Sequence, residues 1–325
     1  MIQDGFQRKI DYIRLSLTDT CNFQCFYCRP RFQETSFSPS NEYLTAFDIE
    51  FMFQVLAQMG VRKVKLTGGE PLLRKDMCDI LQKISAISQI KDISLTTNGY
   101  FLENIAYALK ESGLKRVNIS LDSLNADTFQ KITQTPTFHR VWRGILKAIE
   151  VGLDPVKLNI VLMKGVNDQE VEDFVELTQK YPLSVRFIEF MPTRQTVQDQ
   201  KKYAVSNEAV LNALKRKYDL FPEINTSHTG PSRNYVLKNG LGSIGFISPI
   251  THNFCDQCNR VRISAKGKLR LCLLGQNEIE LLQIIRQRDA NQFEKIFMKS
   301  MVFKPKAHEL NMRAPWVESF VTIGG

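Results

Sequence analysis

Residues 13–28, Ile-Arg-Leu-Ser-Leu-Thr-Asp-Thr-Cys-Asn-Phe-Gln-Cys-Phe-Tyr-Cys, join a short apolar run to three closely spaced cysteines. Apolar runs of this kind, here residues 13–18, are typical of strands in a parallel sheet that is covered on both faces. Cys21, Cys25 and Cys28 follow the run in a C-x3-C-x2-C pattern. The stretch therefore predicts a buried strand whose carboxyl end leads into a loop with three thiols.

The same combination of strand and amphipathic segment recurs along the chain. Further strand-like runs are found at 64–67, 93–97, 117–121, 156–162 and 185–190. Helical patterns lie between them, near 45–60, 76–88, 101–112, 138–151 and 168–180. Six β-then-α units in a row imply one parallel sheet with right-handed crossovers. We therefore predict an α/β fold, an incomplete (β/α)6 TIM-like barrel whose functional residues lie at the carboxyl ends of the strands.

The alternation ends after about residue 192. A polar stretch is followed by a helical pattern near 206–217, and the Ser, Thr, Asn and Gly content of 224–234 predicts a loop. Shorter strand-like runs follow at 242–248, 261–264 and 268–273. We predict two domains, a partial barrel over 1–220 and a smaller C-terminal unit over 221–325.

Composition indicates an ordinary globular protein of 325 residues, with 43% hydrophobic and 24% charged residues. The first residues contain no apolar core of signal-peptide length, and no apolar run approaches the roughly 20 residues that span a bilayer. We therefore expect a cytoplasmic protein without membrane association. The net charge of +9 favours an anionic partner. Because the cations are dispersed, a small polyphosphate fits better than nucleic acid.

Seven cysteines, an odd number, argue against a disulfide framework in a chain without a secretion signal. Cys78 sits among apolar residues at helical spacing and is expected in the core. The first triplet, Cys21, Cys25 and Cys28, can ligate three corners of a 4Fe–4S cluster and leave one iron open. Structural zinc prefers four ligands, and no fourth Cys or His lies nearby.

A second triplet consists of Cys255, Cys258 and Cys272. Three thiolates again suit a cluster with one open iron. His252 lies close in sequence, so a zinc site with three Cys ligands and one His remains an alternative at this point.

Two motifs together resemble the radical S-adenosylmethionine (SAM) superfamily: C-x3-C-x2-C after the first strand and Gly68-Gly69-Glu70-Pro71 after the second. The resemblance implies that the open iron of the first cluster binds SAM. It also implies that SAM is then cleaved to a 5′-deoxyadenosyl radical, which removes a hydrogen atom from the substrate.

A more specific resemblance is to the GTP 3′,8-cyclase family of molybdenum cofactor biosynthesis. It rests on residues 258–272, CNRVRISAKGKLRLC, and on 66–74, 96–99, 118–122, 186–191 and the terminal Gly-Gly. It implies a lyase that uses two 4Fe–4S clusters and SAM. The reaction implied converts GTP to (8S)-3′,8-cyclo-7,8-dihydroguanosine 5′-triphosphate.

The resemblance also implies roles for individual residues. The second cluster would be held by Cys255, Cys258 and Cys272. SAM contacts would come from Tyr27, Gly69, Ser120 and Met191. GTP contacts would come from Arg14, Lys65, Thr96, Lys157, Arg260 and Arg262, with Lys65 standing where the family commonly has arginine. Catalytic positions would be Arg186, Arg260, Arg262 and the tail residues Gly324 and Gly325.

The implied partners are GTP, an external electron donor and a downstream cyclic pyranopterin monophosphate synthase that takes the product; a homodimer is left open. Two alternatives remain at this point. One is another two-cluster radical SAM enzyme that acts on a peptide. The other is a zinc-dependent nucleic-acid-binding protein, against which the cysteine spacing and the dispersed cations argue.

Overall fold

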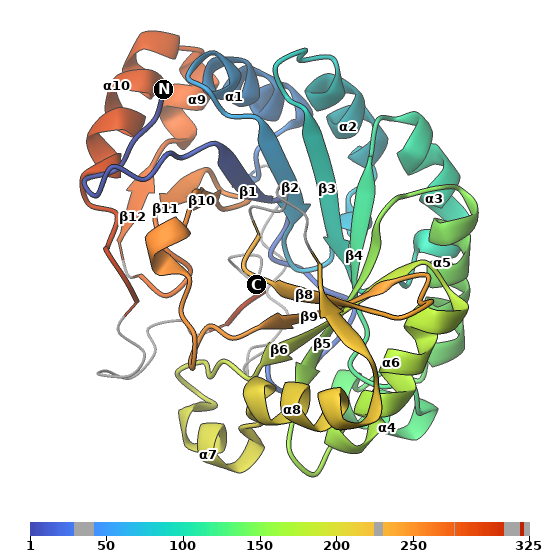
Figure 1. Ribbon diagram of the computed structural model, residues 1–325. Helices are drawn as coiled ribbons and strands as arrows, with labels where there is room; N and C mark the ends of the chain where they lie inside the picture. Colours follow the sequence, from blue (N-terminus) through green and yellow to red (C-terminus); the bar gives the residue numbers. More distant parts are fainter. Residues whose placement is uncertain (29–41, 224–229, 276, 309–318, 322–325) are drawn as a thin grey trace.

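The computed structural model describes residues 1–28, 42–223, 230–275, 277–308 and 319–321. Within these ranges one 12-stranded sheet runs in the order β12-β11-β10-β1-β2-β3-β4-β5-β6-β9-β8-β7. The two end strands of the described sheet do not pair, so the sheet curves around a centre without closing (Figure 1). The predicted α/β fold with an incomplete barrel is confirmed.

The six central strands are the predicted β units. Their bounds are β1 (Tyr12–Ser16), β2 (Lys63–Thr67), β3 (Asp92–Thr97), β4 (Arg116–Ser120), β5 (Val156–Leu162) and β6 (Leu183–Glu189). Neighbours pair in parallel, with Arg14 beside Lys65 and Lys65 beside Ser94. The predicted bounds of these six strands agree with the observed bounds within two residues. β1 ends before the expected Thr18, although Leu17 stays buried and its N–H donates to the Thr67 carbonyl at 2.8 Å.

Helices cover the outer face of these strands (Figure 1). They are α1 (Ala46–Gln58), α2 (Met77–Ser85), α3 (Leu102–Glu111), α4 (Ala126–Thr133), α5 (Phe138–Glu150) and α6 (Val171–Lys180). α1 begins with a capping box in which Thr45 and Asp48 each accept the other's backbone N–H. α4 was not predicted. It has 8 residues and buries few of them, chiefly Phe129 and Ile132, so its apolar pattern is short.

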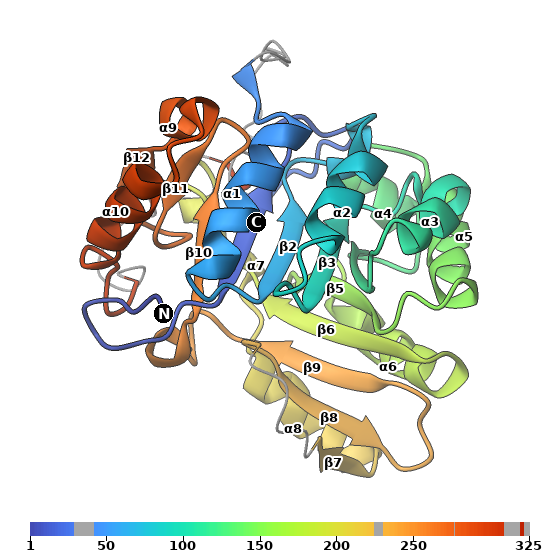
Figure 2. The ribbon, with the colours of Figure 1, turned by 90° about the horizontal axis from the view of Figure 1, so that it is seen from above.

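Strands from the C-terminal part extend the sheet at both sides. β9 (Ser243–Ile247) pairs in parallel with β6 and is followed outward by β8 (Arg233–Leu237) and β7 (Leu220–Pro222), as Figure 2 shows. β10 (Arg260–Ile263) pairs in parallel with β1, followed by β11 (Lys268–Arg270) and β12 (Glu278–Glu280). The expected loop over 224–234 was wrong at its end, because Arg233 and Asn234 pair with β9.

The remaining helices complete the described chain. They are α7 (Gln200–Tyr203), α8 (Asn207–Lys217), α9 (Leu282–Gln287) and α10 (Ala290–Met301), with short 3-10 turns η2 (Pro71–Leu73), η3 (Asp168–Glu170), η4 (Val197–Asp199) and η5 (Cys255–Gln257). α8 is the helix predicted near 206–217. No helix in the described ranges is long and apolar enough to cross a membrane.

Alternation along the strands separates the apolar core from the barrel interior. In β1, Ile13 and Leu15 are fully buried in the main hydrophobic core, whereas Arg14 between them lines the interior. Because side chains alternate across a strand, the same pattern places Lys65 of β2 and Arg262 of β10 on the inner side. Several cationic side chains therefore face the interior.

Candidate active site

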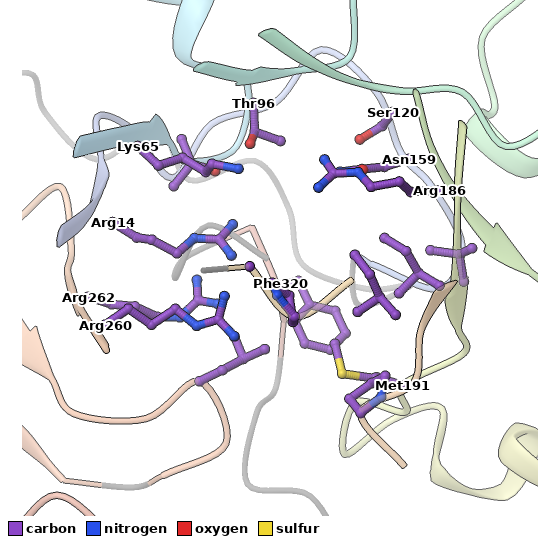
Figure 3. A pocket seen from close by; sticks show the side chains of 18 of the residues that line it. Arg14, Lys65, Thr96, Ser120, Asn159, Arg186, Met191, Arg260, Arg262 and Phe320 are labelled. Carbon is purple, nitrogen blue, oxygen red and sulfur yellow. The ribbon is translucent and has the colours of Figure 1, made fainter. Parts of the chain in front are cut away.

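The barrel interior holds a cavity of about 540 Å³. It is lined by every predicted site residue that lies in the described ranges: the six triplet cysteines, Tyr27, Gly69, Ser120, Met191, Arg14, Lys65, Thr96, Lys157, Arg186, Arg260 and Arg262. Gly324 and Gly325 lie outside the described residues. Figure 3 shows Arg14, Arg260 and Arg262 converging on the centre from one side, opposite Arg186 and Ser120.

The first triplet lies in the loop that follows the carboxyl end of β1. Burial raises the pKa of the Cys25 thiol, and the nearby thiols of Cys28 and Cys21 add to this effect. Because the neighbouring thiols disfavour ionisation of Cys25, the group suits a positively charged iron centre, which would bind all three as thiolates. The donor set therefore fits an iron–sulfur cluster with one iron left for another ligand.

Gly68 and Gly69 follow β2 and allow the loop after this strand to lie against the loop that carries the first triplet. The Gly69 N–H donates to the Thr18 carbonyl at 2.8 Å, and the Glu70 N–H donates to the Thr20 carbonyl at 2.8 Å. A Cβ on Gly69 would come within 2.1 Å of the Thr20 oxygen and 3.1 Å of the Cys21 nitrogen. Glycine at position 69 therefore sets how closely the two loops approach.

Gly69→Ala is expected to lower the melting temperature of the chain and its capacity to bind iron, because the loop of Cys21 must move. The loss of stability should be about 1–3 kcal/mol, as for other overpacked sites. Thermal unfolding and iron content after anaerobic reconstitution measure both effects. Gly230→Ala is the matched control, since a Cβ there meets nothing within 4 Å. Equal stability of the two variants would contradict the steric argument.

Tyr27 is positioned by a carboxylate that carried no assigned role in the sequence. Its hydroxyl donates to Asp122 Oδ2 at 2.6 Å, and the Val161 N–H donates to Asp122 Oδ1 at 2.8 Å. Burial raises the pKa of Asp122 to about 6, partly offset by these hydrogen bonds. Asp122 thus links the ends of β4 and β5 to the aromatic ring beside Cys28. Its sequence signals were its place after a predicted strand and its position in 118–122, one of the stretches that carry the family resemblance.

The second triplet lies at the opposite end of the barrel. Cys255 and Cys258 precede β10, and Cys272 follows β11. Because β10 runs parallel to β1 with Arg260 beside Tyr12, these cysteines lie near the amino end of β1, whereas the first triplet follows its carboxyl end. The cavity lies between the two thiol sets.

The second set also fits an iron–sulfur cluster. Burial raises the pKa of Cys258, but the positive charges of Lys304 and Arg260 outweigh it, and the net pKa is lowered. His252, the alternative zinc ligand, is exposed, and its ring lies 3.3 Å from the Thr251 hydroxyl. It is not among the residues that line the cavity with the cysteines. The structure therefore does not support the zinc alternative.

Cations from neighbouring strands form a continuous row across the cavity. In the sheet register Arg262 pairs with Arg14, and Arg14 pairs with Lys65. Burial, reinforced by Arg260, lowers the pKa of Arg14 to about 10; burial and Arg14 lower the pKa of Arg262. Crowded, partly desolvated cations of this kind are stabilised by a polyanion.

The far wall carries hydrogen-bonding groups that the protein itself leaves open. Arg186 donates through Nη2 to Asn118 Oδ1 at 2.7 Å, which fixes its orientation. Within the described residues its buried Nε has no hydrogen-bond partner, and neither does the buried Oδ1 of Asn159 on the adjacent strand β5. Buried polar atoms without partners are uncommon in native proteins, so both are suited to a ligand. Sequence reasoning found Arg186 but missed Asn159.

The last described residues reach the cavity. The Phe320 N–H donates to the Cys28 carbonyl at 3.2 Å, and the Ser319 hydroxyl donates to the same oxygen at 3.0 Å. The Phe320 ring packs beside Met191 (Figure 3). The C-terminal segment thus lies against the first triplet, four residues before the predicted Gly324.

Known proteins resemble this chain over both halves. Residues 15–178 match the Radical SAM superfamily, and residues 183–310 match the family described as Molybdenum Cofactor Synthesis C. The GTP 3′,8-cyclase of Desulforamulus reducens is 42% identical over 94% of this chain and 95% of that protein. This chain belongs to the GTP 3′,8-cyclase family. A second member, from Moorella thermoacetica, is 40% identical and covers 100% of both chains.

Solved structures resemble this member of the GTP 3′,8-cyclase family in fold. Streptococcus suis SuiB bound to the precursor peptide SuiA superposes with a TM-score of 0.59 at 14% identity, covering 98% of this chain and 70% of that one. SuiB bound to S-adenosylmethionine gives a TM-score of 0.56 at 15% identity, covering 89% and 68%. At such identities the likeness shows the shared barrel alone.

Proposed function

We propose that this chain is a GTP 3′,8-cyclase. It would convert GTP to (8S)-3′,8-cyclo-7,8-dihydroguanosine 5′-triphosphate as the first step of molybdenum cofactor biosynthesis. The observation that carries the proposal is a single cavity with a three-thiol set at each end and a row of cations between them. Family membership supports the same reaction and argues against the nucleic-acid-binding alternative.

The residues divide the work by their place in the cavity. Cys21, Cys25 and Cys28 would hold one 4Fe–4S cluster, and the second triplet would hold the other. When bound, the first cluster and SAM supply hydrogen-atom abstraction from the ribose of the substrate. Asp122 holds Tyr27 at this end of the cavity.

At the other end the protein binds and orients the nucleotide. Arg14, Lys65 and Arg262 would bind the triphosphate, where arginine offers paired donors and lysine a compact charge. Arg186, held by Asn118, would contact the substrate from the far wall. These contacts would keep the ribose close to the first triplet, and Ser319 and Phe320, which lie against that triplet, would help to exclude water there. The same proposal includes a domain division at residue 220, an external electron donor and a downstream synthase. It also includes a homodimer and a cytoplasmic location.

The proposal is tested by anaerobic incubation of the iron-reconstituted chain with GTP, SAM and dithionite, followed by mass analysis. We expect the cyclised nucleotide together with 5′-deoxyadenosine. Formation of 5′-deoxyadenosine without a GTP product would refute GTP as the substrate and favour the peptide-modifying alternative. Failure to bind any iron and sulfide would overturn the cluster sites.

GTP affinity is expected to fall as the pH rises through about 8. Burial, followed by repulsion from Arg186, lowers the pKa of Lys157 to about 8. A bound triphosphate favours the charged amine, so binding takes up a proton above this pH, and affinity drops by up to about tenfold per pH unit. Below it Lys157 is already charged, and this contribution is independent of pH.

Isothermal titration calorimetry between about pH 7 and 9, in buffers of different ionisation enthalpy, measures both affinity and proton uptake. Lys157→Met should bind GTP about 10- to 100-fold more weakly at low pH, and the difference should shrink progressively as the pH rises above about 8. Lys147→Met, at a partly exposed site on α5 that does not line the cavity and where Lys147 bonds Glu150, is the control. An unchanged pH profile in Lys157→Met would refute the assignment.

A further inference from the structure

Lys304 lies in the segment that follows α10 and has no role in the family resemblance described above. Only 3% of it is exposed. Lys306, two residues later, is exposed to solvent. Burial of one lysine but not its neighbour indicates that a specific set of contacts holds Lys304 inside the protein.

Three acceptors surround the Lys304 amine. Its Nζ lies 2.7 Å from the Leu271 carbonyl, 3.0 Å from the Arg260 carbonyl and 3.5 Å from Cys258 Sγ. A lysine ammonium has three donors, so all of them are used. The contacts bridge two segments of the second cluster site, because Leu271 precedes Cys272, and Arg260 follows Cys258 by two residues.

The charge of this amine needs an anion. None of its partners within the described residues is a carboxylate. Burying an ammonium against neutral carbonyls alone is costly. A thiolate at Cys258, the state in which cysteine ligates iron, provides the missing negative charge at the observed contact.

The segment around Lys304 is itself anchored to the same site. Arg8 donates to the carbonyls of Cys255, Pro305 and Lys306 at 2.7, 2.7 and 2.8 Å. Its guanidinium is held in turn by Asp4 at 2.6 Å. The N-terminal residues thus fix the 304–306 segment relative to the first cysteine of the second triplet.

We propose that Lys304 is a positioning residue of the second cluster, which holds the Cys258 thiolate, Arg260 and the strand leading to Cys272 in register and sets the cluster's reduction potential. The inference rests on the proposed function, because it takes the second triplet as a cluster site. Removing a positive charge beside a cluster makes the gain of an electron less favourable, so the midpoint potential should fall.

The test uses the full chain with Cys21, Cys25 and Cys28 replaced by serine, so that only the second cluster assembles. In this background Lys304→Met is compared with the parent, with Lys304→Arg and with the exposed control Lys306→Met. The measurements are iron and sulfide content, iron loss to a chelator, the midpoint potential from a titration followed by electron paramagnetic resonance, and thermal unfolding with and without the cluster.

We expect Lys304→Met to shift the midpoint potential downward and to lose iron about 10- to 100-fold faster. The substitution should lower the melting temperature of the cluster-loaded chain, in which Lys304 pairs with the iron-bound Cys258 thiolate. It should not lower that of the cluster-free chain, in which the buried Lys304 charge has no such thiolate to pair with. Lys304→Arg, which keeps the charge, should return the potential toward that of the parent. Lys306→Met should match the parent.

Equal destabilisation of the loaded and cluster-free chains with an unchanged potential would overturn the proposal and leave Lys304 a structural residue. If Lys304→Met does not fold, Lys304→Gln, which keeps hydrogen-bond donors without the charge, decides between the same two results. A parent background that binds no iron would instead overturn the second cluster site, and with it the proposed function.

Discussion

The Cys25→Ser chain is expected to bind about half of the iron of the parent and to form no detectable 5′-deoxyadenosine. Cys25 lies between Cys21 and Cys28 in the loop after β1, and its thiol is buried beside theirs. Serine removes one of three ligands, and three thiolates are the fewest that leave a 4Fe–4S cluster with a single open iron. Because the second triplet lies at the other end of the cavity, its cluster should survive.

Cys272→Ser is the informative counterpart. It should also lose about half of the iron, but 5′-deoxyadenosine should still form while the cyclised nucleotide does not. Cys78→Ser is the control, because Cys78 packs against the hydrophobic core and does not line the cavity. It should keep full iron content. Iron and sulfide assays and mass analysis of both products distinguish the three variants, and loss of 5′-deoxyadenosine in Cys272→Ser would contradict the separate roles of the two sets.

The barrel could be predicted from the sequence because its strands carry a strong local signal. A parallel strand buried on both faces reads as a continuous apolar run, and β5 was placed at its observed bounds, Val156–Leu162. The edge strands gave no such signal. β7 and β12 each have 3 residues and contain none that is fully buried. They exist because β8 and β11 offer an edge to pair with, which only the assembled sheet provides.

The residues of the site likewise divide into those with a local sequence signal and those without one. Cysteine spacing and the Gly-Gly pair are local patterns, and they pointed to the right loops. The partners that hold these loops come from distant parts of the chain: Lys304 meets Cys258 across 46 positions, and Arg8 meets Cys255 across 247. Glu189 at the end of β6 likewise accepts the N–H groups of Ile250 and Thr251, just before the second triplet. Such contacts depend on tertiary structure and have no sequence period.

Replacement of both Arg260 and Arg262 by alanine is expected to lower cyclisation of GTP by between about 100-fold and 10,000-fold. Both side chains line the cavity from β10, and Arg262 is buried beside Arg14. A hydrogen bond to a charged group contributes about 1.5–3 kcal/mol, so the loss of two such contacts to the nucleotide corresponds to the expected range. Formation of 5′-deoxyadenosine should remain detectable, because the first triplet lies at the opposite end of β1.

Arg270→Ala is the matched control for this pair. Arg270 lies opposite Arg262 in the β10–β11 register, yet it bonds Glu278 and does not line the cavity. Its loss should leave cyclisation within about threefold of the parent, because neither Arg270 nor its partner Glu278 lines the cavity. Single-turnover assays that quantify both products separate a binding defect from a failure to generate the radical. No other described residue of β10 brings a cation into the cavity, so none on this strand could replace the two arginines. Unchanged GTP turnover in the double variant would therefore show that Arg260 and Arg262 do not bind the substrate.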